Sequence, residues 1–193
     1  MKQLYALFIA STLFFSACGG SDTVTTDGET TESNQVFYFS YKTAEFNINV
    51  PDTWEIIDSF TSEYPNDLRA AFKNNVKDSI FTANVTVIRE DNTLSDTSYD
   101  FAQRKLADHE ETLISYSLVS QEVINLQVDG AESKTMLSIF EGKNDTSSPN
   151  LTFMQVTLTK GQKAFTATAS YRTGENELTI EELETMLRSF TLN

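Results

Sequence analysis

LTFMQVTLTKGQKAFTATASY, residues 151 to 171, contains two apolar, β-branched runs that are separated by a short polar break. Residues 151–159 and 164–171 have the composition of strands, and Lys160-Gly161-Gln162 is typical of a tight turn. Strands joined by so short a turn run antiparallel. This stretch therefore predicts a β-hairpin within an antiparallel sheet.

Similar patterns occur before this hairpin. Residues 36–42 alternate aromatic and polar side chains, and residues 46–50 repeat apolar side chains with period two, so each predicts a strand with one buried face. Pro51-Asp52 predicts a turn, after which residues 54–57 begin another extended segment. Further strands are predicted at 83–89, 118–128 and 131–140, and the polar stretch 141–150 predicts a loop.

Two segments change to helical spacing. Residues 97–114 place Leu106, His109 and other side chains on one stripe, which predicts an amphipathic helix. Near the C-terminus, Thr179 and Glu182 have the spacing of a capping box, which predicts the start of a second helix. Strands with one helix among them and one after them indicate an α+β fold, in which helices cover an antiparallel sheet.

Three segments carry a family resemblance: YKTAEFNINVPDTWEII (41–57), IFTANVTVIRED (80–91) and ELTIEELETMLRSFTLN (177–193). They resemble PsbP-like domains, a family of photosystem II extrinsic subunits and small bacterial lipoproteins. The resemblance covers most of residues 36–193, whose 158 residues have the size of one ordinary domain. It implies the α/β/α sandwich, with a central antiparallel sheet, of PsbP-like and Ran-binding nucleotide-release-factor-like proteins, and a non-catalytic role. Nothing in the sequence indicates a photosynthetic role.

Residues 1–17 have the parts of a secretory signal peptide: Lys2 near the start, an apolar run over 4–15, and small residues at the end. The run is shorter than the roughly 20 residues that a membrane span needs. Ser16-Ala17-Cys18-Gly19 then resembles the lipobox of bacterial lipoproteins, with Phe15 at the usual Leu position. The resemblance implies cleavage before Cys18 and acyl chains, such as palmitate, on this residue. The alternative is an incidental thiol at the end of a signal peptide.

Cys18 is the single cysteine, which excludes an intramolecular disulfide and a cysteine-based zinc site. Two or more acyl chains hold a protein stably on a membrane. We therefore expect a lipid-anchored protein of the cell envelope that faces the periplasm or the exterior. Because Gly19 rather than Asp follows Cys18, the outer membrane is favoured if the organism is Gram-negative.

The chain is acidic, with 14 Lys and Arg against 28 Asp and Glu and a net charge of −14. Removing Lys2 with the signal peptide leaves 13 against 28, a net charge of −15. Such a charge repels phosphate backbones, so nucleic acid is not an expected partner. Residues 18–35 are acidic and rich in Thr, with almost no apolar side chains, and are predicted to form a disordered tether after the lipidated cysteine.

Few residues indicate chemistry. His109 is the single histidine, and it is either a packing residue of the helix seam or a proton acceptor beside Asp108 or Glu110. Trp54 is either a core anchor or an exposed ring that stacks on a ligand. Trp54 and His109 are therefore the candidate ligand-binding residues. We predict no cofactor and no metal site.

Two clusters of charged residues each allow a functional interpretation and a solvated one. An acidic loop has the oxygen ligands that Ca²⁺ prefers but lacks the spacing of a calcium loop, so a solvated loop and helix start is the alternative. A short basic run either faces an anionic partner or is a solvated face. The acidic loop contains Glu90, Asp91, Asn92, Asp96 and Asp100. The basic run contains Arg69, Lys73 and Lys77.

The sequence therefore predicts a non-catalytic, lipid-anchored envelope protein that binds another envelope protein or assists assembly or maintenance. A surface lipoprotein that binds a small ligand or a cation, with Trp54 at the rim of its pocket, is the alternative. An enzyme would have to rely on carboxylates alone, and no pair of them can be placed together from sequence. We therefore do not expect an enzyme.

Overall fold

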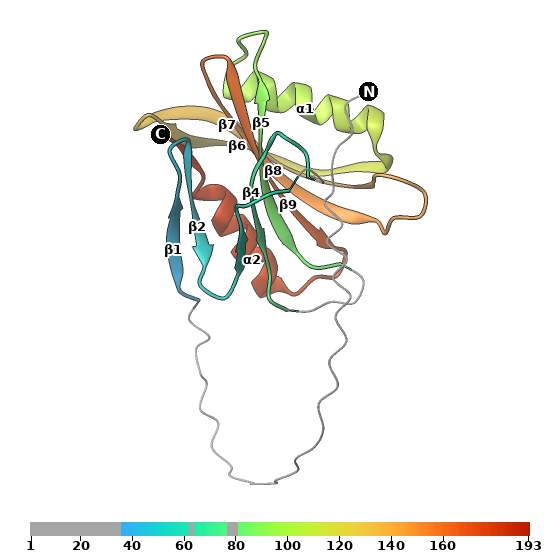
Figure 1. Ribbon diagram of the computed structural model, residues 1–193. Helices are drawn as coiled ribbons and strands as arrows, with labels where there is room; N and C mark the ends of the chain where they lie inside the picture. Colours follow the sequence, from blue (N-terminus) through green and yellow to red (C-terminus); the bar gives the residue numbers. More distant parts are fainter. Residues whose placement is uncertain (1–35, 62–63, 77–80) are drawn as a thin grey trace, which may run out of the picture.

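The computed structural model describes residues 36–61, 64–76 and 81–193, which form a ten-stranded sheet with two helices (Figure 1). The helices are α1 (Ser98–Thr112) and α2 (Glu177–Arg188). The strands are β1 (Tyr38–Lys42), β2 (Phe46–Pro51), β3 (Glu55–Ile57), β4 (Leu68–Lys73), β5 (Asn84–Asp91), β6 (Ile114–Val128), β7 (Ala131–Lys143), β8 (Leu151–Lys160), β9 (Lys163–Arg172) and β10 (Thr191–Leu192).

The hairpin predicted from residues 151–171 is confirmed and lies near the middle of the sheet. Strands β8 and β9 pair antiparallel without a break from Leu151 opposite Arg172 to Lys160 opposite Lys163. The turn contains Gly161 at a φ of 57°, a left-handed conformation that glycine adopts without steric cost. The strand order across the sheet is β1-β2-β10-β6-β7-β8-β9-β5-β4-β3.

The two faces of β8 bury different side chains because successive residues of a strand point to opposite sides. Met154, Val156 and Leu158 belong to the larger core cluster, which also contains the apolar side of α2. Phe153 belongs to a second cluster together with side chains of α1, and Gln155 of the same face contacts that helix. One helix therefore covers each face, with α1 crossing one end of the sheet (Figure 1).

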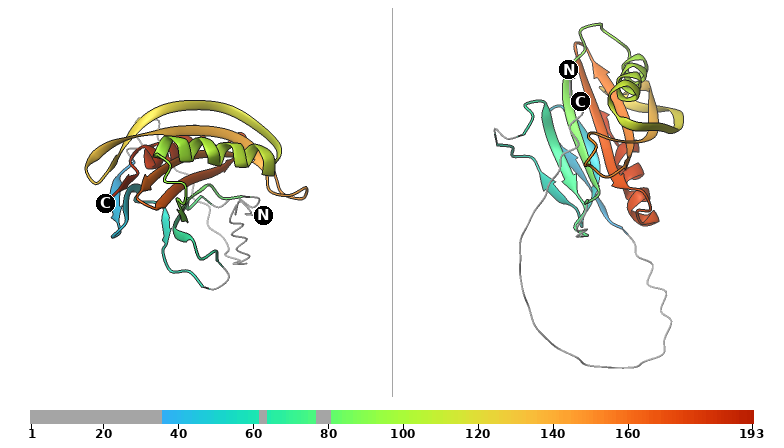
Figure 2. Two further views of the ribbon diagram at one scale, coloured as in Figure 1. Left: turned by 90° about the horizontal axis from the view of Figure 1, so that it is seen from above. Right: turned by 90° about the vertical axis from the view of Figure 1, so that its right-hand side faces the viewer.

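The sheet is curled, and this differs from the expected layered sandwich. Tyr41 on β1 and Phe72 on β4 come from opposite ends of the strand order, yet their rings meet edge to face with centroids 5.2 Å apart. The sheet is also mixed rather than purely antiparallel, because Thr191–Leu192 pairs parallel with Gln127–Val128. The larger core is thus enclosed by strands as well as by α2. In Figure 2, β6 and β7 form a long curved ribbon beside α1.

The helix boundaries differ slightly from those predicted. Thr97 is the N-cap of α1, as its position at the start of the predicted segment suggested, but the helix ends at Thr112 and Ile114 already begins β6. The predicted capping box of α2 is wrong: Asn176 is the N-cap, and its side chain accepts a hydrogen bond from the backbone N–H of Leu178. Thr179 is instead a buried residue within the helix.

The strands also differ from those predicted in three places. Residues 36–42 were expected to bury one face, but of the alternating aromatic residues only Tyr41 packs against the larger core, whereas Phe37 and Phe39 are exposed. Strand β4 was not predicted, because the small Ala70 and Ala71 interrupt its pattern of large apolar residues. The predicted loop at 141–150 is shorter than expected, since β7 continues to Lys143.

Candidate functional site

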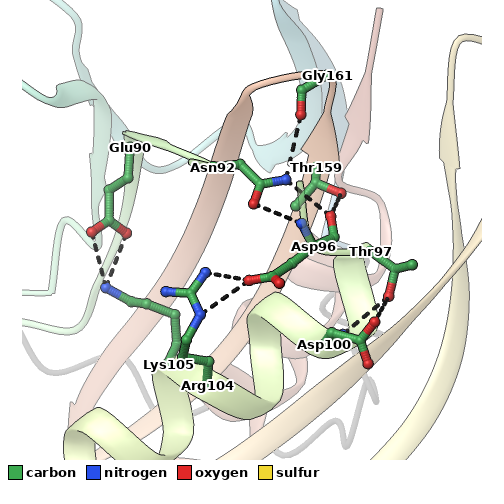
Figure 3. Close-up of polar contacts among 9 residues, drawn as sticks. All are labelled: Glu90, Asn92, Asp96, Thr97, Asp100, Arg104, Lys105, Thr159 and Gly161. Atoms are coloured by element: carbon green, nitrogen blue, oxygen red, sulfur yellow. Dashed lines mark hydrogen bonds and ion pairs between the residues drawn. The ribbon is translucent and has the colours of Figure 1, made fainter. Parts of the chain in front are cut away.

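The acidic loop between β5 and α1 is organised by one buried amide (Figure 3). The Nδ2 atom of Asn92 donates hydrogen bonds to the carbonyl oxygens of Asp96, at 2.9 Å, and Gly161, at 3.4 Å. Its Oδ1 atom accepts from the backbone N–H of Asp96, also at 2.9 Å. The hydroxyl of Thr159 donates to the same Asp96 carbonyl at 3.2 Å. Asn92 therefore joins the loop to the β8–β9 turn.

The carboxylates of this loop pair with basic residues of α1. Lys105 Nζ lies 2.9 Å and 3.2 Å from the two carboxylate oxygens of Glu90. Arg104 Nε donates to Asp96 Oδ2 at 3.0 Å, and its Nη2 atom contacts the same oxygen. The side chains of Lys105 and Glu90 are only 11% and 17% exposed, so this ion pair is mostly desolvated. These pairs attach α1 to the end of β5.

The remaining acidic groups of the loop are partnered as well. Asp91 pairs with Lys163 at 2.5 Å, and Asp100 accepts from the N-cap hydroxyl of Thr97 at 2.7 Å. Figure 3 shows the carboxylates of Glu90, Asp96 and Asp100 each bonded to a different partner rather than converging on one point. Among residues 36–61, 64–76 and 81–193, no group of three or more His, Cys, Asp or Glu side chains is arranged to hold a metal ion. The loop is thus built as a structural brace.

His109 lies in the seam between α1 and β8. Its side chain is buried, its ring stacks on Phe140 with centroids 4.9 Å apart, and its Nε2 atom lies 3.2 Å from Gln155 Oε1. Because the amide nitrogen of Gln155 donates to Thr168 at 2.9 Å, its oxygen is the acceptor and His109 Nε2 carries the proton.

The surroundings of His109 favour its neutral form. Burial and, to a smaller extent, the nearby charge of Lys105 lower its pKa from 6.5 to about 4, while the hydrogen bond with Gln155 opposes the shift. Asp108 and Glu110, the predicted acidic partners, are exposed on the helix. The imidazole is therefore uncharged at neutral pH and is placed as a packing residue.

Trp54 lies on the other side of the sheet. It belongs to the larger core cluster, and its indole Nε1–H donates to Glu182 Oε2 of α2 at 2.9 Å. Its buried ring is not presented to solvent as a stacking surface. Trp54 thus lies in the larger core cluster and His109 packs on Phe140 of the second, so the two candidate ligand-binding residues do not form a common site.

The predicted basic run is matched by carboxylates where it is described. Arg69 Nε lies 3.9 Å from Glu45, which also pairs with Arg89 at 2.5 Å, and Lys73 pairs with Glu55 at 3.1 Å. The third member of the run, Lys77, lies outside the described residues. These pairs connect the β1–β2 turn, β3, β4 and β5, and they leave Arg69 and Lys73 little excess positive charge toward an anionic partner.

Two exposed apolar surfaces were not predicted as functional. The first is formed by Phe37, Tyr38 and Phe39 at the start of β1, where Phe37 is 61% exposed. The second lies on β6, where Val119 and Val123 are 58% and 53% exposed. Two features of the sequence could have indicated these surfaces. Residues 37–39 are three consecutive aromatic residues, and residues 114–128 contain no Lys, Arg or Pro.

No helix in the described part of the chain combines the length and the apolar character of a membrane span. The predicted signal peptide, the lipidation site at Cys18 and the tether of residues 18–35 all lie outside the described residues. The predicted lipid anchor therefore remains a prediction.

Comparison with solved structures identifies the fold. The solution structure of cyanobacterial PsbP (CyanoP) from Synechocystis matches with a TM-score of 0.55 and 15% identity, over 86% of this chain and 98% of that one. The crystal structure of LpqN, a protein involved in cell envelope biogenesis of Mycobacterium tuberculosis, matches with a TM-score of 0.52 and 13% identity, over 83% of this chain and 92% of that one. No protein-family model and no curated protein sequence matches. The fold is therefore PsbP-like.

Proposed function

We propose that this chain is a non-catalytic, lipid-anchored protein of the cell envelope that binds another envelope protein. The observation that best supports a binding rather than a catalytic role is that the side chains that could carry chemistry are engaged in contacts within the fold. The acidic loop is bonded internally, the single histidine is buried and uncharged, and the indole of Trp54 is hydrogen bonded to α2. Large side chains at the start of β1 are instead exposed to solvent.

Envelope placement is supported by the signal-like segment and the lipobox-like motif that ends at Cys18. That LpqN, of similar fold, is described as involved in cell envelope biogenesis agrees with this placement. Phe37, Tyr38 and Phe39 lie immediately after the predicted tether. A partner held at the same membrane would therefore meet them first.

The anchor can be tested with the full chain expressed in a bacterium. We expect the wild type to partition into the detergent phase of Triton X-114, with a mass equal to the chain from Cys18 onward plus its acyl groups. Cys18→Ser is a matched control because it removes the only thiol and leaves residues 36–193 unchanged. Equal partitioning of the two proteins would contradict lipidation.

The binding role can be tested by placing a photo-crosslinking amino acid at Phe37 in living cells. A discrete crosslinked product with a second envelope protein is expected from this position. The same amino acid at Leu178, which is also half exposed but lies on α2, is the control. If Phe37 gives no product, or both positions give the same products, these aromatic residues are not a docking surface.

A further inference from the structure

The outer edge of β6 is the longest unpaired strand edge in the described part of the chain. One side of β6 pairs with β7, and on the other side only Gln127 and Val128 have a described partner, the two-residue strand β10. Residues 114–126 therefore present backbone N–H and C=O groups without a described neighbouring strand.

Beyond the two register shifts near its start, this edge lacks the usual protection against strand pairing. Natural edge strands carry Lys or Pro, or are very short, whereas β6 has fifteen residues and contains no Lys, Arg or Pro. Its single charged side chain, Glu122, pairs with Arg188 of α2 in the same chain. The other two described terminal edges are shorter: β3 has three residues, and β1 has five and ends in Lys42.

A regular segment of β6 is bounded on both sides. Register shifts in the pairing with β7 fall between Ile114 and Ser117 and between Leu118 and Ser120. From Ser120 to Leu126 the register is continuous, and at Gln127 the edge is occupied by β10. The segment available for an added strand is therefore residues 120–126, SQEVINL, and its central residue is Val123.

We propose that a second copy of this chain adds its β6 to this edge, antiparallel, with residues 120–126 of the two copies paired about a twofold axis at Val123. On the face next to α1, this register places the exposed Val123 against its own counterpart and Gln121 opposite Asn125, whose amides can hydrogen bond. On the other face, Glu122 lies opposite Ile124, and each Glu122 keeps Arg188 as its partner.

The ends of this segment fit the twofold arrangement. Continuing the ladder by one residue would place Val119 of one copy opposite Gln127 of the other, where β10 already pairs. The bulge between Leu118 and Ser120 ends the regular strand at that point. A closed, isologous pair follows, because the same seven residues serve both copies.

Net charge opposes this dimer at low ionic strength. Each copy carries a net charge of −14, or −15 from residue 18 onward, so we expect association to strengthen as salt screens the repulsion. Self-association goes beyond the proposed function and does not depend on lipidation or on a second envelope protein.

The test uses the chain from residue 18 onward with Cys18→Ser, which prevents disulfide-linked dimers. Sedimentation velocity over a concentration series, at about 0.1 and about 1 M salt (Debye lengths of about 10 and 3 Å), should show a monomer–dimer equilibrium that shifts to dimer in high salt. Val123→Lys should raise the dissociation constant by about tenfold or more, because it places like charges directly opposite each other. Val119→Lys, on the same strand but outside the paired segment, should leave the constant unchanged.

The register can be tested by crosslinking in the same background. Val123→Cys supplies the only thiol, and residues directly opposite in an antiparallel pair have Cα atoms about 4.5–5.5 Å apart, within disulfide range. Mild oxidation should therefore give a disulfide dimer with Val123→Cys but not with Val119→Cys. A chain that stays monomeric at every concentration and salt, or equal effects of the changes at 119 and 123, would overturn the proposal. Either result would leave the tests of Cys18 and Phe37 unaffected.

Discussion

Acidification should destabilise this fold through His109. The unfolded chain exposes an imidazole with a pKa of 6.5, whereas burial lowers the pKa to about 4 in the folded protein. Between these two values the unfolded chain binds a proton that the folded chain does not bind, so the free energy of unfolding falls as the pH falls. The stabilising contribution of neutral His109 is complete above pH 6.5 and is lost as the pH approaches 4.

The size of this effect follows from the two pKa values. A difference of about 2.5 units, at 1.36 kcal/mol per unit, corresponds to about 3 kcal/mol when both states are fully titrated. By about pH 5 roughly 2 kcal/mol should already be lost. Typical domains unfold with only about 5–15 kcal/mol. One buried histidine therefore controls a large share of the stability in this pH range.

Urea unfolding at several pH values between about 8 and 5 measures the effect. The fluorescence of Trp54, the only tryptophan, reports unfolding because its ring is buried in the fold. His109→Gln keeps an amide donor toward Gln155 but cannot titrate. Its free energy of unfolding should therefore lie below that of the wild type at high pH and approach it as the pH falls. A difference between the two proteins that does not change with pH would refute the role assigned to His109.

Three further predictions concern the contacts that hold the helices. Lys105→Ala should lower the free energy of unfolding by about 1–3 kcal/mol, because it leaves Glu90 unpaired at a mostly buried position. Lys163→Ala removes an exposed ion pair and should lower it by less than about 1 kcal/mol. Equal losses for the two variants in urea unfolding would contradict the role of the Lys105–Glu90 pair as a brace. Asn92→Ala should cost about 2 kcal/mol and speed amide hydrogen exchange in the loop before α1, and unchanged exchange rates would argue against its organising role. Trp54→Phe should lower stability by about 1 kcal/mol by removing the hydrogen bond to α2, and a gain in thermal stability would be the opposite outcome.

Local features of the fold could be predicted because the residues that produce them are neighbours in the chain. The β8–β9 hairpin needs only two strand-forming runs and a glycine turn, and the cap of α1 needs only Thr97 beside the first turn. The capping box predicted at Thr179 failed because residues 176 and 179 can both cap a helix locally. The position of Thr179 was settled by burial and by a hydrogen bond from Asn74, 105 residues earlier in the chain.

The candidate site shows the same limit. That His109 falls on the apolar stripe of a helix was evident from spacing, but its low pKa results from burial in the seam against Phe140 and from the charge of Lys105, which outweigh the hydrogen bond with Gln155. The oxygen-rich loop was equally evident, yet its composition did not indicate that Lys105 and Arg104 of the following helix would neutralise it. An acidic loop that binds calcium and one that braces a helix can have the same composition, because the difference lies in what the fold places opposite each carboxylate.

The sequence alone established an α+β chain with an acidic character, the central hairpin, a helix within residues 97–114, and the cysteine chemistry that excludes a disulfide. Periodicity, turn chemistry and residue counts act over a few positions, so no tertiary information was needed. The tertiary structure established the curl of the sheet, the pairing of Trp54 with Glu182 across 128 residues, and the open edge of β6. These features depend on which strand lies beside which, and burial and pairing between distant segments set that order.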